Sequence, residues 1–231
     1  MRDPAAILLR LRRVRARANS MIDRWYYRVP ARATEPYATH LPVLICLARI
    51  RKIRRILELG AGTHSTLTFL DRAAFPDLDT LHSLETNASW AERVQTAAGD
   101  ERRMTLTLVA GTMASALSTI DVDAYDLIFV DDSERRATIA QLVRCRPRSA
   151  IVVVHDFENP AYRAAARGFA HRYRFAALNP NVGVLSNTRF DTRDLDRLTH
   201  VVAESRDRIA TSSRHEWCEL MNVAFGTARG S

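Results

Sequence analysis

Short apolar runs that alternate with helical patterns between residues 55 and 186 constrain the fold of this chain more than any other feature. Two of these runs, Tyr125–Asp131 (YDLIFVD) and Ala150–His155 (AIVVVH), are almost continuously apolar, as strands buried on both faces of a parallel sheet are. Regular alternation of strands and helices predicts a doubly wound α/β fold. The 231 residues suffice for one such domain with appendages.

The expected elements follow from periodicity and turn residues. The expected strands are 55–59, 80–85, 104–109, 125–131, 150–155, 174–178 and 182–186. The expected helices are 42–51 with Thr39 as N-cap, 65–73, 89–98, 134–145, 160–171 and 191–210. Asn179-Pro180-Asn181 is a turn signal, so the last two strands form a hairpin and one of them is antiparallel. We therefore expect a mostly parallel seven-stranded sheet with an antiparallel last strand.

The beginning of the chain differs in charge from the rest. Residues 4–28 carry an apolar stripe at helical spacing, and nine arginines against two aspartates in residues 1–34 account for seven of the eight net positive charges. We divide the chain into a basic amphipathic helical arm (1–34), the α/β domain (35–190) and a C-terminal helical extension (191–231). The arm is expected to pack on the domain or on a second subunit of a homodimer. A membrane surface or an anionic partner is the alternative.

Composition excludes several classes of protein. No apolar run approaches the roughly 18 residues of a transmembrane helix, and the chain does not open with the pattern of a secretory signal. Cys46, Cys145 and Cys218 are far apart and lack metal-ligand spacing. We therefore expect a cytoplasmic protein with reduced thiols and no transmembrane segment.

The first strand leads into the segment 58–62 (ELGAG). A glycine turn after the first strand of such a sheet is a ligand site, and Gly60 and Gly62 let the backbone approach a ligand without a Cβ atom in the way. A dinucleotide site would need a third glycine where Ser65 stands. Glu58, inside the strand end, suits a cationic amino-acid ligand and opposes a pyrophosphate.

Glu85 ends the second strand, 25 residues after Gly60, where a carboxylate accepts hydrogen bonds from ribose hydroxyls. With this acid in place, the sequence resembles the class I S-adenosylmethionine-dependent methyltransferases, in the branch of small-molecule O-methyltransferases that includes sugar and macrolide modifiers. The matching segments are ILELGAGTHST (56–66), LHSLETN (81–87), LVAGT (108–112), YDLIFVDDS (125–133) and AIVVVHDFE (150–158).

The resemblance implies S-adenosylmethionine as the cofactor. It places Gly60–Gly62 at the methionyl part, Glu85 at the ribose, Thr112 near the adenine and Asp131 beneath the amino-acid end. The predicted cofactor-binding residues are Glu58, Gly60, Ala61, Gly62, Ser65, Glu85, Thr112 and Asp131.

Asp131 and Asp156 follow the fourth and fifth strands, which are expected to be neighbours about 4.8 Å apart. One interpretation is a hard divalent cation such as Mg²⁺ between the two carboxylates. Compared with metal-dependent members of the family, however, Phe157 replaces an asparagine ligand and Glu134 replaces the catalytic lysine. We therefore assign no metal ligand.

The alternative is that His155 or Asp156 acts as a general base, since imidazole titrates near neutral pH; His155 as a mere strand cap is the third interpretation. The candidate catalytic residues are Asp131, His155 and Asp156. His40 and His64 can also face this site, but we interpret both as structural.

These observations predict in-line methyl transfer from S-adenosylmethionine to a hydroxyl or amine of a small molecule. Two alternatives stay open: a nucleic-acid or protein methyltransferase that uses the basic arm, and a non-catalytic protein of the same fold that acts by association. The nearly neutral body of the chain argues against nucleic acid, as does the absence of the Asn/Asp-Pro-Pro-Tyr segment of many nucleobase methylases.

Overall fold

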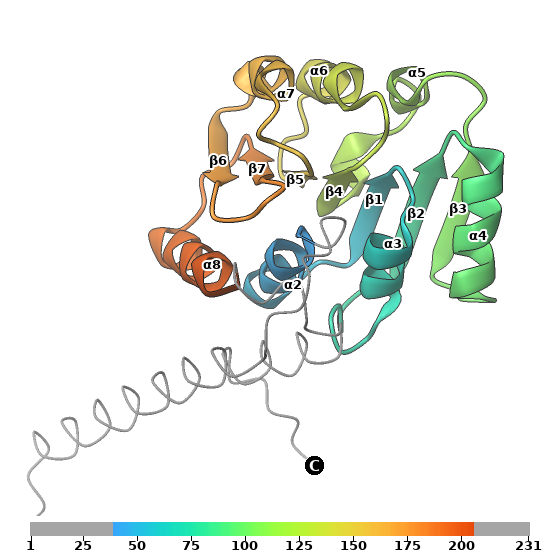
Figure 1. The fold of residues 1–231 in the computed structure, drawn as a ribbon, viewed down its shortest axis with the longest axis horizontal. Coiled ribbons are helices and arrows are strands. Elements are labelled where there is room, and N and C mark those ends of the chain that lie inside the picture. The colour runs from blue at the N-terminus through green and yellow to red at the C-terminus, as the bar shows by residue number, and fades with distance from the viewer. Residues whose placement is uncertain (1–38, 206–231) are drawn as a thin grey trace, which may run out of the picture.

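The structure, a computed structural model, describes residues 39–205 (Figure 1). The predictions for the arm at 1–34, for Cys218 and for residues 206–231 lie outside the described residues. No helix in the described part of the chain has the length and apolarity needed to cross a membrane. The cytoplasmic location and the homodimer stay predictions.

One mixed sheet forms the centre of the fold, with the strand order β3-β2-β1-β4-β5-β7-β6. The strands are β1 Arg55–Leu59, β2 Thr80–Glu85, β3 Met104–Leu108, β4 Leu127–Val130, β5 Ile151–Val154, β6 His171–Phe175 and β7 Val182–Ser186. β7 pairs antiparallel with both β5 and β6, and all other pairs are parallel. The predicted mostly parallel seven-stranded sheet with an antiparallel last strand is confirmed.

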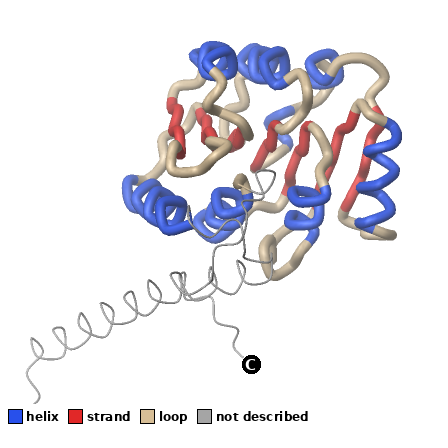
Figure 2. The backbone as a smooth tube through the Cα atoms, in the orientation of Figure 1, coloured by secondary structure: helices blue, strands red, loops and turns tan. Residues whose placement is uncertain are grey.

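Helices cover both faces of the sheet (Figures 1 and 2). They are α2 Leu41–Ile50, α3 Thr63–Leu70, α4 Ala88–Ala98, α5 Met113–Leu117, α6 Arg135–Cys145, α7 Pro160–Ala165 and α8 Thr192–Ser205, with 3₁₀ turns η2 Val122–Ala124 and η3 Ala166–Gly168. One buried cluster joins α2, α3 and α8 to the sheet, and a second joins α5, α6 and η3 to its other face. The strand order reverses between β1 and β4, and ligands bind at such a point in doubly wound sheets.

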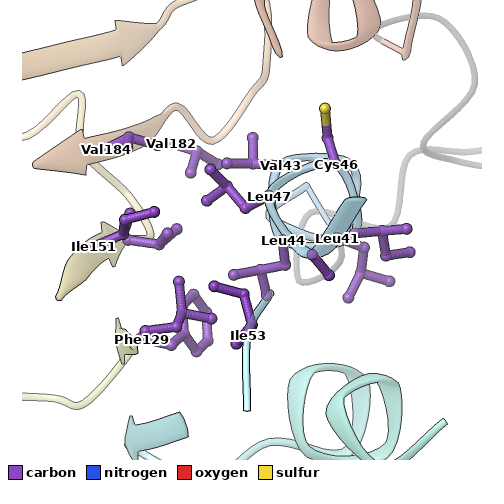
Figure 3. Close-up of a cluster of buried hydrophobic side chains, with 14 of the residues drawn as sticks. Leu41, Val43, Leu44, Cys46, Leu47, Ile53, Phe129, Ile151, Val182 and Val184 are labelled. Carbon is purple, nitrogen blue, oxygen red and sulfur yellow. The ribbon is translucent and has the colours of Figure 1, made fainter. Parts of the chain in front are cut away.

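α2 is buried along almost its whole length, because its residues from Leu41 to Ala48 are all buried. Figure 3 shows the helix end-on beside the strands, with Val43, Leu44 and Leu47 on the side that faces β4, β5 and β7. α8 packs on α2 and adds buried apolar side chains to the same cluster. The division of the chain at 190/191 stays a prediction, and α8 shares its core with the domain that precedes it.

The structure differs from the sequence predictions in several details, and the short helix α5 Met113–Leu117 was not predicted. The helix expected at 160–171 ends at Ala165, and β6 begins at His171 rather than at 174. The chain turns here because η3 packs against α6: a Cβ at Gly168 would lie 2.3 Å from a methyl carbon of Val143. The N-cap of α2 is His40 and not Thr39; the hydroxyl of Thr39 instead lies at hydrogen-bond distance from His155.

Candidate active site

The carboxyl ends of β1, β2, β4 and β5 meet where the strand order reverses. Gly60 donates its backbone N–H to the carbonyl of Leu84 at the end of β2, with N and O 2.9 Å apart. Asp131 donates its backbone N–H to the carbonyl of Leu59 at the end of β1, at 2.8 Å. These bonds fix the glycine loop beside Glu85, which ends β2, and Asp131, which follows β4.

Gly60 is required by both its conformation and its surroundings. Its φ is +89°, a region that residues with a Cβ atom rarely adopt. A Cβ there would lie 2.6 Å from the backbone nitrogen of Asp132 and 2.7 Å from the carbonyl carbon of Asp131. The glycine loop therefore rests directly on the segment that carries the candidate catalytic acid.

Glu58 anchors the glycine loop from inside the protein. The side chain is fully buried and accepts hydrogen bonds from the hydroxyls of Ser65 at 2.5 Å, Ser83 at 2.6 Å and Thr66 at 2.7 Å. Burial raises the pKa of Glu58 to about 7, against the opposing effect of the three hydroxyls. The carboxyl group thus ties α3 to β2, and cofactor binding by Glu58 and Ser65 stays a prediction.

Glu85 presents a carboxylate of fixed orientation at the end of β2. Its Oε1 accepts hydrogen bonds from the backbone N–H groups of Thr86 and Asn87, each at 2.8 Å. The neighbouring residue on β3 is Leu108, whose side chain is 54% exposed. An oriented acid beside an exposed apolar side chain matches the needs of a ribose and an adjoining base.

Two further predicted cofactor residues take part in local structure. Thr112 caps α5, because its hydroxyl accepts a hydrogen bond from the N–H of Ser115 at 3.1 Å. The carbonyl of Ala61 accepts a hydrogen bond from the indole of Trp90 on α4. Trp90 thereby holds the glycine loop from outside, a role that no pattern in the sequence indicated.

The structure brings together all three candidate catalytic residues. Asp131 Oδ1 and His155 Nδ1 are 3.1 Å apart, and His155 Nδ1 lies 3.7 Å from Asp156 Oδ1. The other ring nitrogen of His155, Nε2, is 2.9 Å from the hydroxyl oxygen of Thr39. His155 is therefore a buried imidazole with a carboxylate on one nitrogen and a hydroxyl on the other, which is the arrangement of a positioned general base.

Arg135, which the sequence analysis did not identify, links the two acids. One guanidinium nitrogen, Nη2, pairs with Asp131 and lies 3.1 Å from Asp156 Oδ2. This cation stands between the carboxylates that were considered as a magnesium site, so the arrangement does not support Mg²⁺ there. Burial raises the pKa of Asp131, but the hydrogen bond to His155 and the nearby positive charges outweigh it, and the pKa is lowered overall.

His40 lies against the same group. Its ring centroid is 4.9 Å from that of His155 and 4.8 Å from that of Phe129. Both ring nitrogens are buried without a hydrogen-bond partner among the described residues. Burial, with a smaller effect of His155, lowers the pKa of His40 to about 3, so the ring is neutral. His64, in contrast, is exposed in the first turn of α3.

No protein-family model and no curated protein sequence matches this chain. Solved structures do. A spermidine synthase in complex with the transition-state analogue AdoDATO matches at a TM-score of 0.53 and 14% identity, over 70% of this chain and 62% of its own length. Human methyltransferase-like protein 13 in complex with SAH matches at a TM-score of 0.50 and 13% identity, over 73% of this chain and 89% of its own length. The O-methyltransferase TomG of Streptomyces achromogenes, in complex with SAM, matches at a TM-score of 0.49 and 19% identity, over 73% of this chain and 96% of its own length.

At these identities the likeness shows the fold. The chain has the Rossmann-like fold of class I S-adenosylmethionine-dependent methyltransferases, as the resemblance of its motifs predicted. It spans less than two thirds of the length of the matching spermidine synthase.

Proposed function

We propose that this protein is an S-adenosylmethionine-dependent methyltransferase that acts on a hydroxyl group of a small molecule, with His155 as the general base. The observation that carries the proposal is the Asp131–His155 pair beside the glycine loop, with the second ring nitrogen of His155 turned toward a hydroxyl. A solved structure of the same fold, human methyltransferase-like protein 13, is in complex with SAH, which supports the choice of cofactor.

The described residues fit this cofactor. Glu85, oriented by two backbone N–H groups, would hold the ribose, and the exposed Leu108 would lie beside the adenine. Gly60 and Gly62 would face the methionyl part. Once bound, S-adenosylmethionine supplies a methyl group that is already activated as a sulfonium. The protein has to orient the acceptor and remove its proton.

Proton removal follows from the geometry around His155. The hydroxyl of Thr39 shows that Nε2 accommodates an alcohol oxygen at 2.9 Å. An acceptor hydroxyl that takes the place of Thr39 would pass its proton to Nε2. Asp131 would hold the proton on Nδ1 and stabilise the resulting imidazolium, and Arg135 would keep Asp131 ionised and in position. A base placed in this way contributes about 10²–10⁴-fold to the rate.

The cofactor part of the proposal is tested by Glu85→Ala. Loss of a carboxylate that accepts ribose hydrogen bonds should weaken S-adenosylmethionine binding by about 1.5–3 kcal/mol, measured by calorimetry. Glu92→Ala, at an exposed position on α4, is the matched control and should bind as the wild type does. Unchanged affinity in Glu85→Ala, or a nicotinamide dinucleotide bound by the wild type, would contradict the assignment.

The catalytic part is tested by His155→Gln on an acceptor found by mass-spectrometric screening of small hydroxyl compounds. Turnover should fall about 10²–10⁴-fold while cofactor affinity stays the same. Thr39→Val, which removes the hydroxyl and keeps the side-chain shape, should retain turnover. Full activity in His155→Gln would place the base elsewhere. Methyl transfer only to nucleic acid or protein, or no cofactor binding at all, would favour the two alternative functions instead.

A further inference from the structure

The neutral ring of His40 has one nitrogen that donates and one that accepts, and both are buried without a hydrogen-bond partner among residues 39–205. Unpaired buried polar atoms are few in folded proteins, and a water molecule or an ion is a common explanation for one. The methyl-transfer reaction proposed above gives His40 no role. An imidazole that has no hydrogen-bond partner in the described part of the chain, placed against a carboxylate and a second imidazole, points to a ligand that the protein binds there.

The position of His40 defines the nature of that ligand. One potential ligand atom from each of His40, Asp131 and His155 lies within 4.8 Å of the other two. The pair Asp131 Oδ1 and His155 Nδ1 is separated by 3.1 Å. Atoms that share a metal ion at about 2.1 Å stand roughly 3–3.5 Å apart. Asp131 and His155 already have this separation, and the unbonded His40 ring has to approach by at most about 2 Å.

We propose that His40, Asp131 and His155 form a binding site for a divalent transition-metal ion such as Zn²⁺ or Fe²⁺. Two imidazoles and one carboxylate are the donor set that such ions select, whereas Mg²⁺ prefers oxygen ligands alone. Three protein ligands leave coordination positions for water or a ligand oxygen. Thr39 completes the arrangement: with Nδ1 of His155 on the ion, Nε2–H donates to the Thr39 hydroxyl, as outer partners of metal-bound histidines do.

Arg135 is the group that opposes the ion. Its guanidinium pairs with Asp131 Oδ1 and with Asp156, so it competes for the same carboxylate. Before an ion binds, two carboxylates and one guanidinium leave a single negative charge, which attracts a cation. The ion also competes with the proton on Nδ1 of His155. A His155 ring that holds the ion through Nδ1 keeps its proton on Nε2 and cannot act as the general base, so the metal-bound form is a separate state from the one that the methyl-transfer proposal uses. Metal binding is measured without cofactor or acceptor, so the two proposals are tested separately.

The test uses the untagged full chain, freed of metal by a chelator and checked for folding by circular dichroism. Zn²⁺ binding is measured by calorimetry, and Co²⁺ binding by visible absorption, which reports nitrogen and oxygen ligands directly. His40→Phe keeps an aromatic ring on Phe129 and removes both nitrogens. It should weaken binding by more than the roughly 10–100-fold that loss of an outer partner costs. His171→Phe, on the far strand β6, is the matched control and should bind as the wild type does.

Two more variants test the same site if His40→Phe fails to fold. Asp131→Asn should also weaken Zn²⁺ binding and change the Co²⁺ spectrum. Arg135→Gln removes the competing cation and should tighten binding. Mg²⁺ should not displace Zn²⁺. The proposal is overturned if the wild type binds neither Zn²⁺ nor Co²⁺, or if His40→Phe and Asp131→Asn bind them as tightly as the wild type.

Discussion

Replacing Glu58 by glutamine tests the energetics of the buried carboxyl under the glycine loop. Glu58 is fully buried among the hydroxyls of Ser65, Thr66 and Ser83, and burial raises its pKa from 4.5 to about 7. Glutamine keeps the shape of the side chain and one acceptor oxygen. The hydroxyls of the neighbouring serine and threonine residues can rotate and accept hydrogen bonds from its amide NH₂ group. The variant therefore removes the ionisation and leaves the packing in place.

The sign and the size of the effect follow from proton linkage. Between pH 4.5 and about 7 the folded state binds more protons at Glu58 than the unfolded state does, so stability falls as pH rises through this window. The contribution of Glu58 is fully present below pH 4.5 and is lost by about pH 7. A pKa difference of this size corresponds to about 3 kcal/mol. Burial also raises the pKa of Asp132, to about 6, and this effect is common to both proteins.

The assay is urea unfolding of both proteins at several pH values from about 4 to 8. We expect the free energy of unfolding of the wild type to fall by about 3 kcal/mol more than that of Glu58→Gln across this range. Glu92→Gln, at an exposed position on α4, should follow the wild type. Parallel pH profiles for the wild type and Glu58→Gln would refute the reasoning, because they would mean that the buried carboxyl does not change its protonation on unfolding.

Three other predictions concern the loop, the core and the arm. Gly60→Ala should destabilise the protein by several kcal/mol in urea unfolding, because it combines strain at positive φ with a backbone clash. Gly99→Ala, also at positive φ but with open space around it, should cost less stability. Equal losses of stability in the two variants would contradict the role of the clash at Gly60. Phe129→Ala should lower the free energy of unfolding by about 3–5 kcal/mol, because Phe129 lies in the buried core. Leu108→Ala, at a 54% exposed site, should lower it far less, and similar losses in the two variants would count against the core assignment. A chain that starts near Ala33 should still bind S-adenosylmethionine in calorimetry, and a truncated protein that folds without binding would show that the arm belongs to the site.

The central strands of this fold are predictable from the sequence, because burial on both faces makes them continuous apolar runs. The expected bounds of β1, β2 and β7 agree with the structure, and β4 and β5 lie within the expected ranges. β6 is harder to predict, since it lies at the edge of the sheet and alternates exposed and partly buried side chains. Its sequence, HRYRF, extends the amphipathic pattern of the preceding helix, and the turn η3, where Gly168 lies close to Val143 of α6, separates the two elements.

The site was predictable where it depends on strand ends and not where it depends on distant contacts. The positions of Asp131, His155 and Asp156 follow from topology, because the carboxyl ends of neighbouring parallel strands meet. Thr39, in contrast, is 116 residues from its partner His155, and no local pattern links them. Arg135 lies four residues after Asp131, a spacing that allows an ion pair on a helix. In the sequence alone, however, Arg135 looks like one of the many charged residues on the surface of a helix.

The burial of α2 has a practical consequence for defining the smallest stable form of this protein. A helix that is apolar on every side cannot be removed without opening the cavity it fills between the sheet and α8. Deletions from the amino terminus that stop before Thr39 keep every described residue of this packing. Deletions that continue into the helix remove core side chains and, in the same step, Thr39 and His40. The shortest chain that folds and the shortest chain that retains the candidate site should therefore begin at the same place.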